Sequence, residues 1–248
     1  MYFKLLACDV LLREIAHCIT RCPHTISPAF MPKGEHVVPA RLRETLQKQI
    51  DSVESDGVAY DAVLLGYGLC GNSTAGLVAR SFPLVIPRAH DCTTLFLGSK
   101  AAFCEHFSAN PSQGWTSIGY SERGGGLVAD GTTSGLSDSD GDFQSMVELY
   151  GEESARYLWE TMHPEKHYHD IIFIDVPETR EPHIEERLRE EAARLGKPIR
   201  ELPGSLRLIE GLLAGNWNSE EFLVIPPGQR VVGVYDQDEI MAAERPAE

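Results

Sequence analysis

Short apolar segments alternate with helix-like segments along this chain, and no other feature of the sequence constrains its fold as strongly. The apolar segments are residues 2–7, 62–66, 84–87, 171–176, 222–228 and 231–236. Helical patterns cover residues 10–19, 39–50, 93–107, 184–196 and 205–215. Apolar runs of this length are typical of strands in a parallel sheet that is covered on both faces. The sequence therefore predicts an α/β fold, with a mostly parallel sheet, helices on both faces and two similar α/β halves.

Two stretches depart from this alternation. Residues 22–36 form a polar, proline-bearing stretch that leads into the second helix. Residues 108–145 are rich in Gly, Ser and Asp, with GGG at 124–126 and SDSDGD at 137–142, which is typical of a long loop or lid. Because no clear linker divides the chain, we expect a single domain over residues 1–248 with this Gly/Ser/Asp-rich loop inserted.

The charge balance excludes several classes of partner. The chain has 22 Lys and Arg against 37 Asp and Glu, which gives a formal net charge of −15. Binding to nucleic acid or to anionic lipid requires a basic surface, so neither is expected. No apolar run approaches the roughly 20 residues that span a bilayer. Charged residues also interrupt the segment where a signal peptide would be apolar, so we expect a cytoplasmic protein.

The cysteines are the strongest sign of chemistry. Without a secretory signal the six cysteines are expected to be reduced, which leaves packing, catalysis or metal binding as their role. Cys8, Cys70 and Cys92 each follow an apolar strand and precede a helix. Parallel strands bring such positions to one edge of the sheet, where ligands bind. The pattern predicts a three-cysteine metal site there, although a single buried cysteine more often serves packing.

The residues beside Cys92 suggest supporting roles. His90 is expected to be a fourth metal ligand or a general acid/base, and Asp91 to orient its imidazole. Arg88 is expected to hold a carboxylate or phosphate of the substrate, or alternatively to pair with a neighbouring acid. His36, in a polar loop before a helix, is a supplementary ligand candidate.

The glycine-rich turn at residues 66–76 suggests a second kind of contact. Gly68, Gly71 and Asn72 are expected to bind a cofactor or anion through main-chain amides at a helix start. The turn has neither the P-loop nor the dinucleotide-binding pattern. A helix N-terminus would also lower the pKa of the Cys70 thiol.

Several segments together resemble the DUF1638 family of bacterial and archaeal proteins: ACDVLLREI, KGEH, YDAVLLGYGLCGN, LVIPRAHDCTTLFLGSK and GLLAGNWNSEEFLVIPPG. The resemblance covers most of the chain, and the GYGLCGN and PRAHDC segments are specific. The positions that match the family's motifs are Cys8, Glu14, His36, Cys70, Arg88, His90, Asp91 and Cys92. Cys18, Cys22 and Cys104 match no motif, which agrees with a packing role. Members resemble companions of corrinoid methyltransferase systems, which implies one-carbon metabolism.

Three functions fit these observations. The first is a zinc enzyme of thiol or methyl transfer that acts on a small anionic or thiol substrate. The second is an enzyme with a [4Fe–4S] cluster, one iron of which is open for desulfuration or dehydration. The third is a non-catalytic metal-binding partner of a corrinoid protein or methyltransferase.

Overall fold

The computed structural model describes residues 1–34, 38–55, 57–110, 113–124, 147, 151–152, 156, 170–234 and 239–245. Most of the loop expected at residues 108–145 lies outside these residues, so that prediction stays a prediction. Within the described ranges, no helix is both long enough and apolar enough to cross a membrane.

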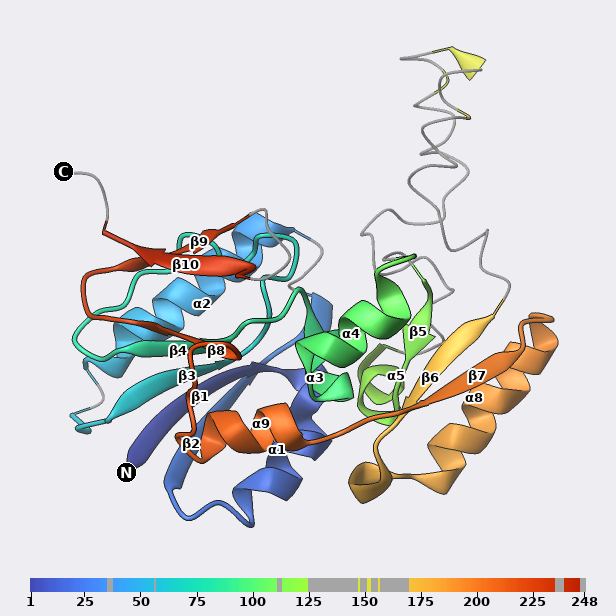
Figure 1. Cartoon of the computed structure of the whole chain (residues 1–248), viewed down its shortest axis with the longest axis horizontal. Helices are drawn as coiled ribbons and strands as arrows, with labels where there is room; N and C mark the ends of the chain where they lie inside the picture. The colour runs from blue at the N-terminus through green and yellow to red at the C-terminus, as the bar shows by residue number, and fades with distance from the viewer. Residues whose placement is uncertain are drawn as a thin grey trace.

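A five-stranded sheet lies at the centre of the larger part of the molecule (Figure 1). In spatial order its strands are β2 (Thr25–Met31), β1 (Tyr2–Cys8), β3 (Ala62–Gly66), β4 (Leu84–Pro87) and β8 (Phe222–Ile225). The first four are parallel to their neighbours, and β8 pairs antiparallel with β4. Every residue of β3 and β4 is buried, because helices or loops cover both faces of the sheet. The predicted α/β class with a mostly parallel sheet is confirmed.

Helices cover the two faces of this sheet. Strand β1 continues through η1 (Asp9–Leu11) and α1 (Leu12–Ile19) to β2, and α2 (Pro39–Val53) then leads back past β1 to β3. Parallel crossovers are right-handed, so two crossovers in opposite directions place their helices on opposite faces. Helix α9 (Arg207–Leu213) packs beside α1, away from α2 (Figure 1).

Strand β2 was not predicted, since residues 22–36 read as a polar connecting stretch. Pro28 lies in the middle of this strand and has no N–H to donate. A proline is tolerated there because β2 is the edge strand and pairs only with β1. Half-exposed side chains also give β2 little of the apolar signal that marks β1 and β3.

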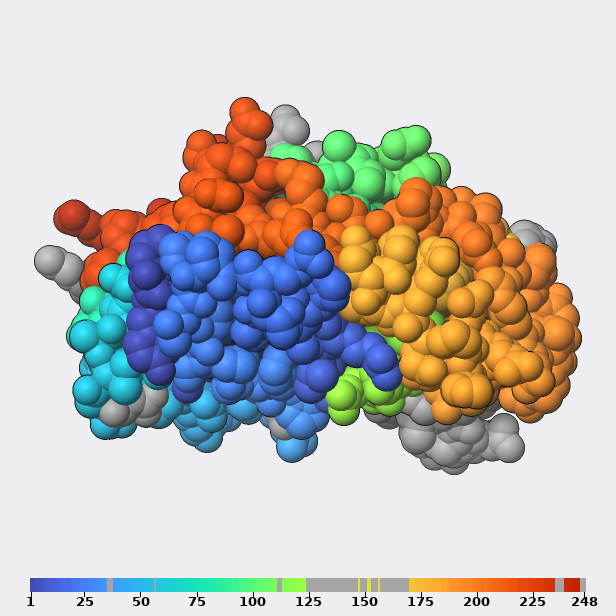
Figure 2. Space-filling view, turned by 90° about the horizontal axis from the view of Figure 1, so that it is seen from below, coloured from blue at the N-terminus to red at the C-terminus, as the bar shows by residue number. Residues whose placement is uncertain are grey.

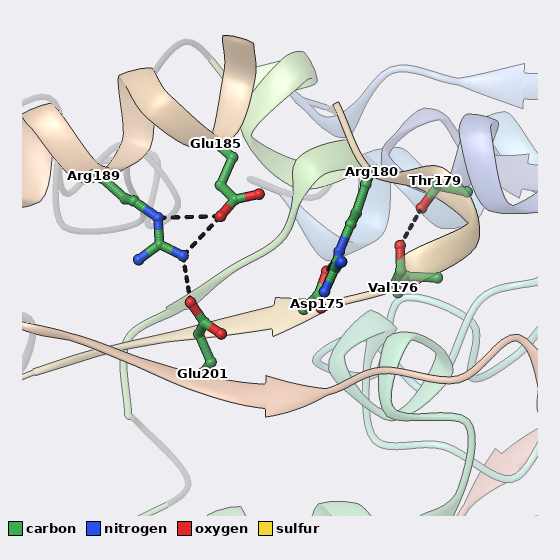
Figure 3. A network of polar contacts seen from close by, with 7 residues as sticks. All are labelled: Asp175, Val176, Thr179, Arg180, Glu185, Arg189 and Glu201. Atoms are coloured by element: carbon green, nitrogen blue, oxygen red, sulfur yellow. Dashed lines mark hydrogen bonds and ion pairs between the residues drawn. The ribbon is translucent and has the colours of Figure 1, made fainter. Parts of the chain in front are cut away.

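A second, three-stranded parallel sheet lies beside the first. Its order is β5 (Trp115–Thr116), β6 (Ile171–Asp175) and β7 (Ile199–Pro203), accompanied by α5 (Ile118–Gly124), η6 (Pro177–Thr179) and α8 (Pro182–Arg194). Arg189 of α8 pairs with Glu185, at 2.7 Å, and with Glu201 of β7 (Figure 3). Arg180 pairs with Asp175 at the end of β6 in the same view.

The remaining described elements are two short helices after β4 and a separate two-stranded sheet. The helical pattern at 93–107 is two helices, α3 (Cys92–Leu97) and α4 (Lys100–Phe107). Gly98 ends α3 with a left-handed φ of 75°, and the Ser99 hydroxyl caps α4. Strands β9 (Arg230–Gly233) and β10 (Met241–Glu244) form an antiparallel hairpin.

The two sheets meet along α1. In the space-filling view the N-terminal segment and the segment that follows β6 lie side by side (Figure 2). The Thr179 hydroxyl of η6 donates to Oε1 of Glu14 on α1 at 2.8 Å. Arg13 pairs with Glu122 of α5 at 2.6 Å. Side chains from both sheets also belong to one hydrophobic cluster, so the core is continuous across the junction.

Candidate thiol site at the carboxyl edge of the sheet

The three predicted cysteines follow three adjacent strands. Cys8 is the last residue of β1, Cys70 lies in the turn after β3, and Cys92 begins α3 after β4. Strands β1, β3 and β4 are neighbours and parallel, so their carboxyl ends meet at one edge. From β1 the chain passes to β2 on one side, and it then crosses back to β3 on the other side of β1. The carboxyl ends of β1 and β3 therefore form a switch point, where open α/β sheets bind ligands.

Main-chain contacts fix the turn after β3 against the turn after β4. The N–H of Leu69 donates to the carbonyl of Ala89, and the N–H of Cys70 donates to the carbonyl of His90, both at 2.8 Å. A Cβ on Gly68 would lie 2.7 Å from the Ala89 carbonyl oxygen and 2.8 Å from the Asp91 nitrogen. Glycine at position 68 is therefore required by the close approach of the two turns.

The first cysteine joins the same site from β1. Cys8 is 2% exposed, and its Sγ lies 3.9 Å from Oδ1 of Asp9. A thiolate at Cys8 or Cys70 would raise the pKa of Cys92 further, and a thiolate at Cys8 would raise the pKa of Cys70. The three thiols thus share one electrostatic environment, whereas Cys18 is buried on α1 and Cys104 lies on α4.

Burial controls the protonation of these thiols. It raises the pKa of Cys8 to about 12, and it also raises the pKa of Cys70 and Cys92 well above the ordinary range. The negative charge of Asp91 adds to the effect at Cys70 and Cys92. The expected lowering of the Cys70 pKa was wrong, because residues 70–73 form a turn and start no regular helix. In the metal-free protein the thiols are neutral at pH 7.

The two residues before Cys92 have structural contacts of their own. Oδ1 of Asp91 accepts the N–H of Thr93 at 2.9 Å and so caps α3. The ring of His90 packs against Phe103, with ring centres 5.3 Å apart. The charge of His90 still acts on the Asp91 carboxyl, so the two remain neighbours. Their predicted roles as metal ligand, acid/base and orienting group stay predictions.

Arg88 is occupied by main-chain oxygens. Its Nε donates to the carbonyl of Ser219 at 2.8 Å, and its Nη1 donates to the carbonyls of Glu239, at 2.7 Å, and Met241. Arg88 therefore ties the segment before β8 and the start of β10 to the end of β4. These contacts favour a structural role for Arg88. Its partners are main-chain carbonyls, whereas the expected alternative was a neighbouring acidic side chain.

The other predicted positions lie around this centre or apart from it. Gly71 and Asn72 both have a left-handed φ, of 61° and 67°, and the Asn72 carbonyl accepts from Arg43 of α2 at 2.7 Å. Their predicted role in cofactor binding stays a prediction. His36 lies outside the described residues. Glu14 is buried at the junction with η6, where it accepts from Thr179, and not among the cysteines.

Lys33 and Tyr120 lie beside the candidate site and were not predicted from the sequence. The Nζ of Lys33 lies 3.7 Å from the centre of the Tyr120 ring, and the N–H of Lys33 donates to Oδ1 of Asp9 at 2.9 Å. The charge of Lys33 acts on Cys8, and it also interacts with Cys92. The signal that could have found Lys33 is the strand β2, since its carboxyl end adjoins that of β1.

The structure places the three cysteines at one edge of the sheet without forming a metal-ligand cluster. Across the part of the chain that the structure describes, no group of three or more His, Cys, Asp or Glu side chains is arranged to hold a metal ion. What the structure provides is the placement of three thiol-bearing residues, one capped helix and one lysine at a single edge of the sheet.

Comparison with protein-family models gives a match to this chain. The model of the family described as "Protein of unknown function (DUF1638)" matches residues 30–213. This span contains Cys70, Cys92 and Lys33 and begins after Cys8. No curated protein and no solved structure matches the chain.

Proposed function

This chain belongs to the DUF1638 family, and we propose that it is a metal-dependent enzyme whose site is formed by Cys8, Cys70 and Cys92. One observation supports the proposal: the three cysteines follow three adjacent parallel strands, at the carboxyl edge that contains the switch point of the sheet. A site made of thiols suits thiophilic metals, and zinc is the first candidate.

Proton loss from the three thiols would favour a cation at this site. Three neutral thiols in one buried environment can each lose a proton when a divalent cation binds, because the cation offsets the desolvation that holds their pKa high. Three protein ligands leave one coordination position for His90 or for a substrate. Zinc, when bound, would hold a substrate thiol as a thiolate at neutral pH.

The protein's own residues prepare this site. Asp91 fixes the first turn of α3 and with it the position of Cys92. Gly68 permits the turn that carries Cys70 to contact the turn before Cys92. We propose thiol or methyl transfer as the reaction, and the link to one-carbon and corrinoid metabolism rests on the family resemblance alone.

A [4Fe–4S] cluster is the second candidate. The observation that favours it is the ligand set itself, three cysteines that leave one iron open for desulfuration or dehydration. Metal analysis and colour separate the two candidates. A zinc protein is colourless, whereas a brown protein after purification without oxygen would favour the cluster and contradict zinc.

The decisive measurement is the metal content of the anaerobically purified protein and of two variants. We expect about one zinc per chain in the wild type and at least a tenfold loss in Cys70→Ala, because one of three protein ligands is gone. Both Cys and Ala have a Cβ, so the left-handed φ of 48° at position 70 is equally strained in each.

Cys104→Ala is the matched control, since Cys104 lies on α4 outside the thiol site. It should retain the wild-type metal content. Stoichiometric metal in Cys70→Ala would remove Cys70 from the ligand set and contradict the proposal. If metal binds but the protein alone does not turn over a methyl donor and a thiol, the third function, a non-catalytic partner of a corrinoid protein, is favoured.

A further inference from the structure

Lys33 brings a positive charge to the thiol site. It follows β2, the strand next to β1, and its N–H donates to the Asp9 carboxylate at 2.9 Å, directly after Cys8. Its ammonium group stands on the face of Tyr120, 3.7 Å from the ring centre. Tyr120 is 7% exposed, so the ring that supports the lysine is itself held in the core.

The described residues balance the charge of Lys33 poorly. Among the described residues, no carboxylate forms an ion pair with its Nζ. Asp9, whose charge acts on Lys33, uses Oδ1 to accept the main-chain N–H of Lys33, and the same oxygen lies 3.9 Å from the Cys8 sulfur. A partly buried cation without an ion pair is a place where an anion gains free energy on binding.

We propose that Lys33 binds the carboxylate of the substrate beside Cys8 and Cys92. A single ammonium is a point charge that suits a monoanionic carboxylate, whereas phosphate commonly takes an arginine fork or several donors. Lys33 thus has the role that the sequence predicted for Arg88. The inference rests on the proposed function in one respect: it takes the bound carboxylate to belong to the substrate of the thiol site.

A pair of alkylating reagents tests the proposal without metal or substrate. Iodoacetate carries a carboxylate, and iodoacetamide is its neutral counterpart of similar size. With both, the cysteine thiolate attacks the CH₂ carbon, an S–C bond forms, the C–I bond breaks and iodide leaves. The measured quantity is the rate of alkylation of Cys92 by iodoacetate divided by its rate of alkylation by iodoacetamide. Both rates are obtained by peptide mass spectrometry on the reduced, metal-free protein, and the ratio is normalised to the same ratio at Cys104.

Lys33→Met should lower the normalised ratio by about five- to tenfold, because it removes the cation that attracts the carboxylate. A change in thiol pKa affects both reagents alike and cancels in the ratio. Lys33→Arg should keep most of the preference. Lys48→Met is the matched control, since Lys48 is an exposed lysine on α2 that pairs with Glu44 at 2.7 Å, and it should leave the ratio unchanged.

Two results would overturn the proposal: an unchanged ratio in Lys33→Met, or a Cys92 that neither reagent reaches. A fall in the ratio that Lys48→Met reproduces would also contradict it, because the effect would then follow net charge. The outcome is independent of metal analysis. Loss of the zinc hypothesis therefore leaves the carboxylate site standing, and loss of the carboxylate site leaves the zinc hypothesis standing.

Discussion

Single residues determine the protonation of the thiol site. The pKa of Cys8 is raised to about 12, and burial also raises the pKa of Cys70 and Cys92. Three thiols that are neutral at pH 7 are poor nucleophiles until a metal replaces their protons. The same property makes metal binding measurable, because every thiolate formed releases a proton.

Zinc binding at pH 7 should release about three protons per metal, one from each thiol of the site. Because all three pKa values are raised, the thiols are protonated at pH 7 and must lose these protons when the metal binds. Proton loss becomes easier as pH rises. The apparent affinity should therefore increase with pH, by up to about tenfold per pH unit for each thiol. Calorimetric titration in buffers of different ionisation enthalpy measures the proton count. Metal binding without proton release would show that the thiols are not the ligands.

Glu14 couples stability to pH at the junction of the two sheets. Burial raises its pKa, the Thr179 hydroxyl opposes the shift, and Oε2 is buried without a hydrogen-bond partner among the described residues. The stabilising contribution of a carboxyl with a raised folded pKa is fully present below its unfolded pKa, near 4.5, and is lost as pH rises through the folded pKa.

Glu14→Gln should therefore gain stability relative to the wild type as pH rises from 4 to 7, because its neutral amide does not ionise. Urea unfolding at several pH values gives the difference in the free energy of unfolding between the two proteins. Glu44→Gln is the control, since Glu44 is exposed on α2. A pH-independent difference for Glu14→Gln would contradict the buried carboxylate.

The sequence predicted where the three cysteines lie in the fold, but not which charged residue lies beside them. Cys8, Cys70 and Cys92 were found from their shared place after apolar strands. Arg88 was preferred as the cation because it lies near Cys92 in the chain, yet its guanidinium binds main-chain carbonyls. Lys33 reaches the site only through the pairing of β2 with β1, which local sequence does not reveal.

At the scale of elements, two turns in backbone contact align the cysteines. Gly68→Ala should destabilise the protein by about 1–3 kcal/mol, because the new Cβ meets main-chain atoms of Ala89 and Asp91 that cannot move independently. It should also weaken metal binding by separating Cys70 from Cys92. Gly34→Ala is the control, since a Cβ there meets nothing within 4 Å. Thermal unfolding of both variants measures the difference, and equal stability would show that the turns can separate freely.

The elements that could be predicted are those with an apolar pattern of their own. Strands β1, β3, β4, β6 and β8 are buried runs, and the periodic Leu42, Leu46 and Ile50 mark α2. Strand β2 was missed because it is an edge strand with a proline, and β7 because its pattern is mostly exposed. Such strands are stabilised mainly by pairing with a neighbouring strand. They are therefore recognised from that pairing in the structure and not from their own sequence pattern.

At the scale of the whole molecule, the two sheets share a core. One hydrophobic cluster includes Leu5 of β1 together with Ile172 and Ile174 of β6. The chain also returns from β7 through α9 to β8, so the larger sheet is completed only after the smaller one. The sheets have five and three strands, and the similarity of two halves that the sequence suggested stays a prediction.

This interleaving predicts that the protein unfolds as one unit, as the expected single domain requires. Loss of the smaller sheet would expose the shared core and remove the support of α1 at Glu14 and Thr179, so neither sheet should remain folded alone. Differential scanning calorimetry should show one transition, with a calorimetric enthalpy close to the van't Hoff enthalpy. Thr179→Val, which removes the hydroxyl that donates to Glu14, should lower the midpoint of that single transition by a few degrees, on the order of 1 kcal/mol. Two separate transitions, of which Thr179→Val moves only one, would instead show two domains that meet at α1.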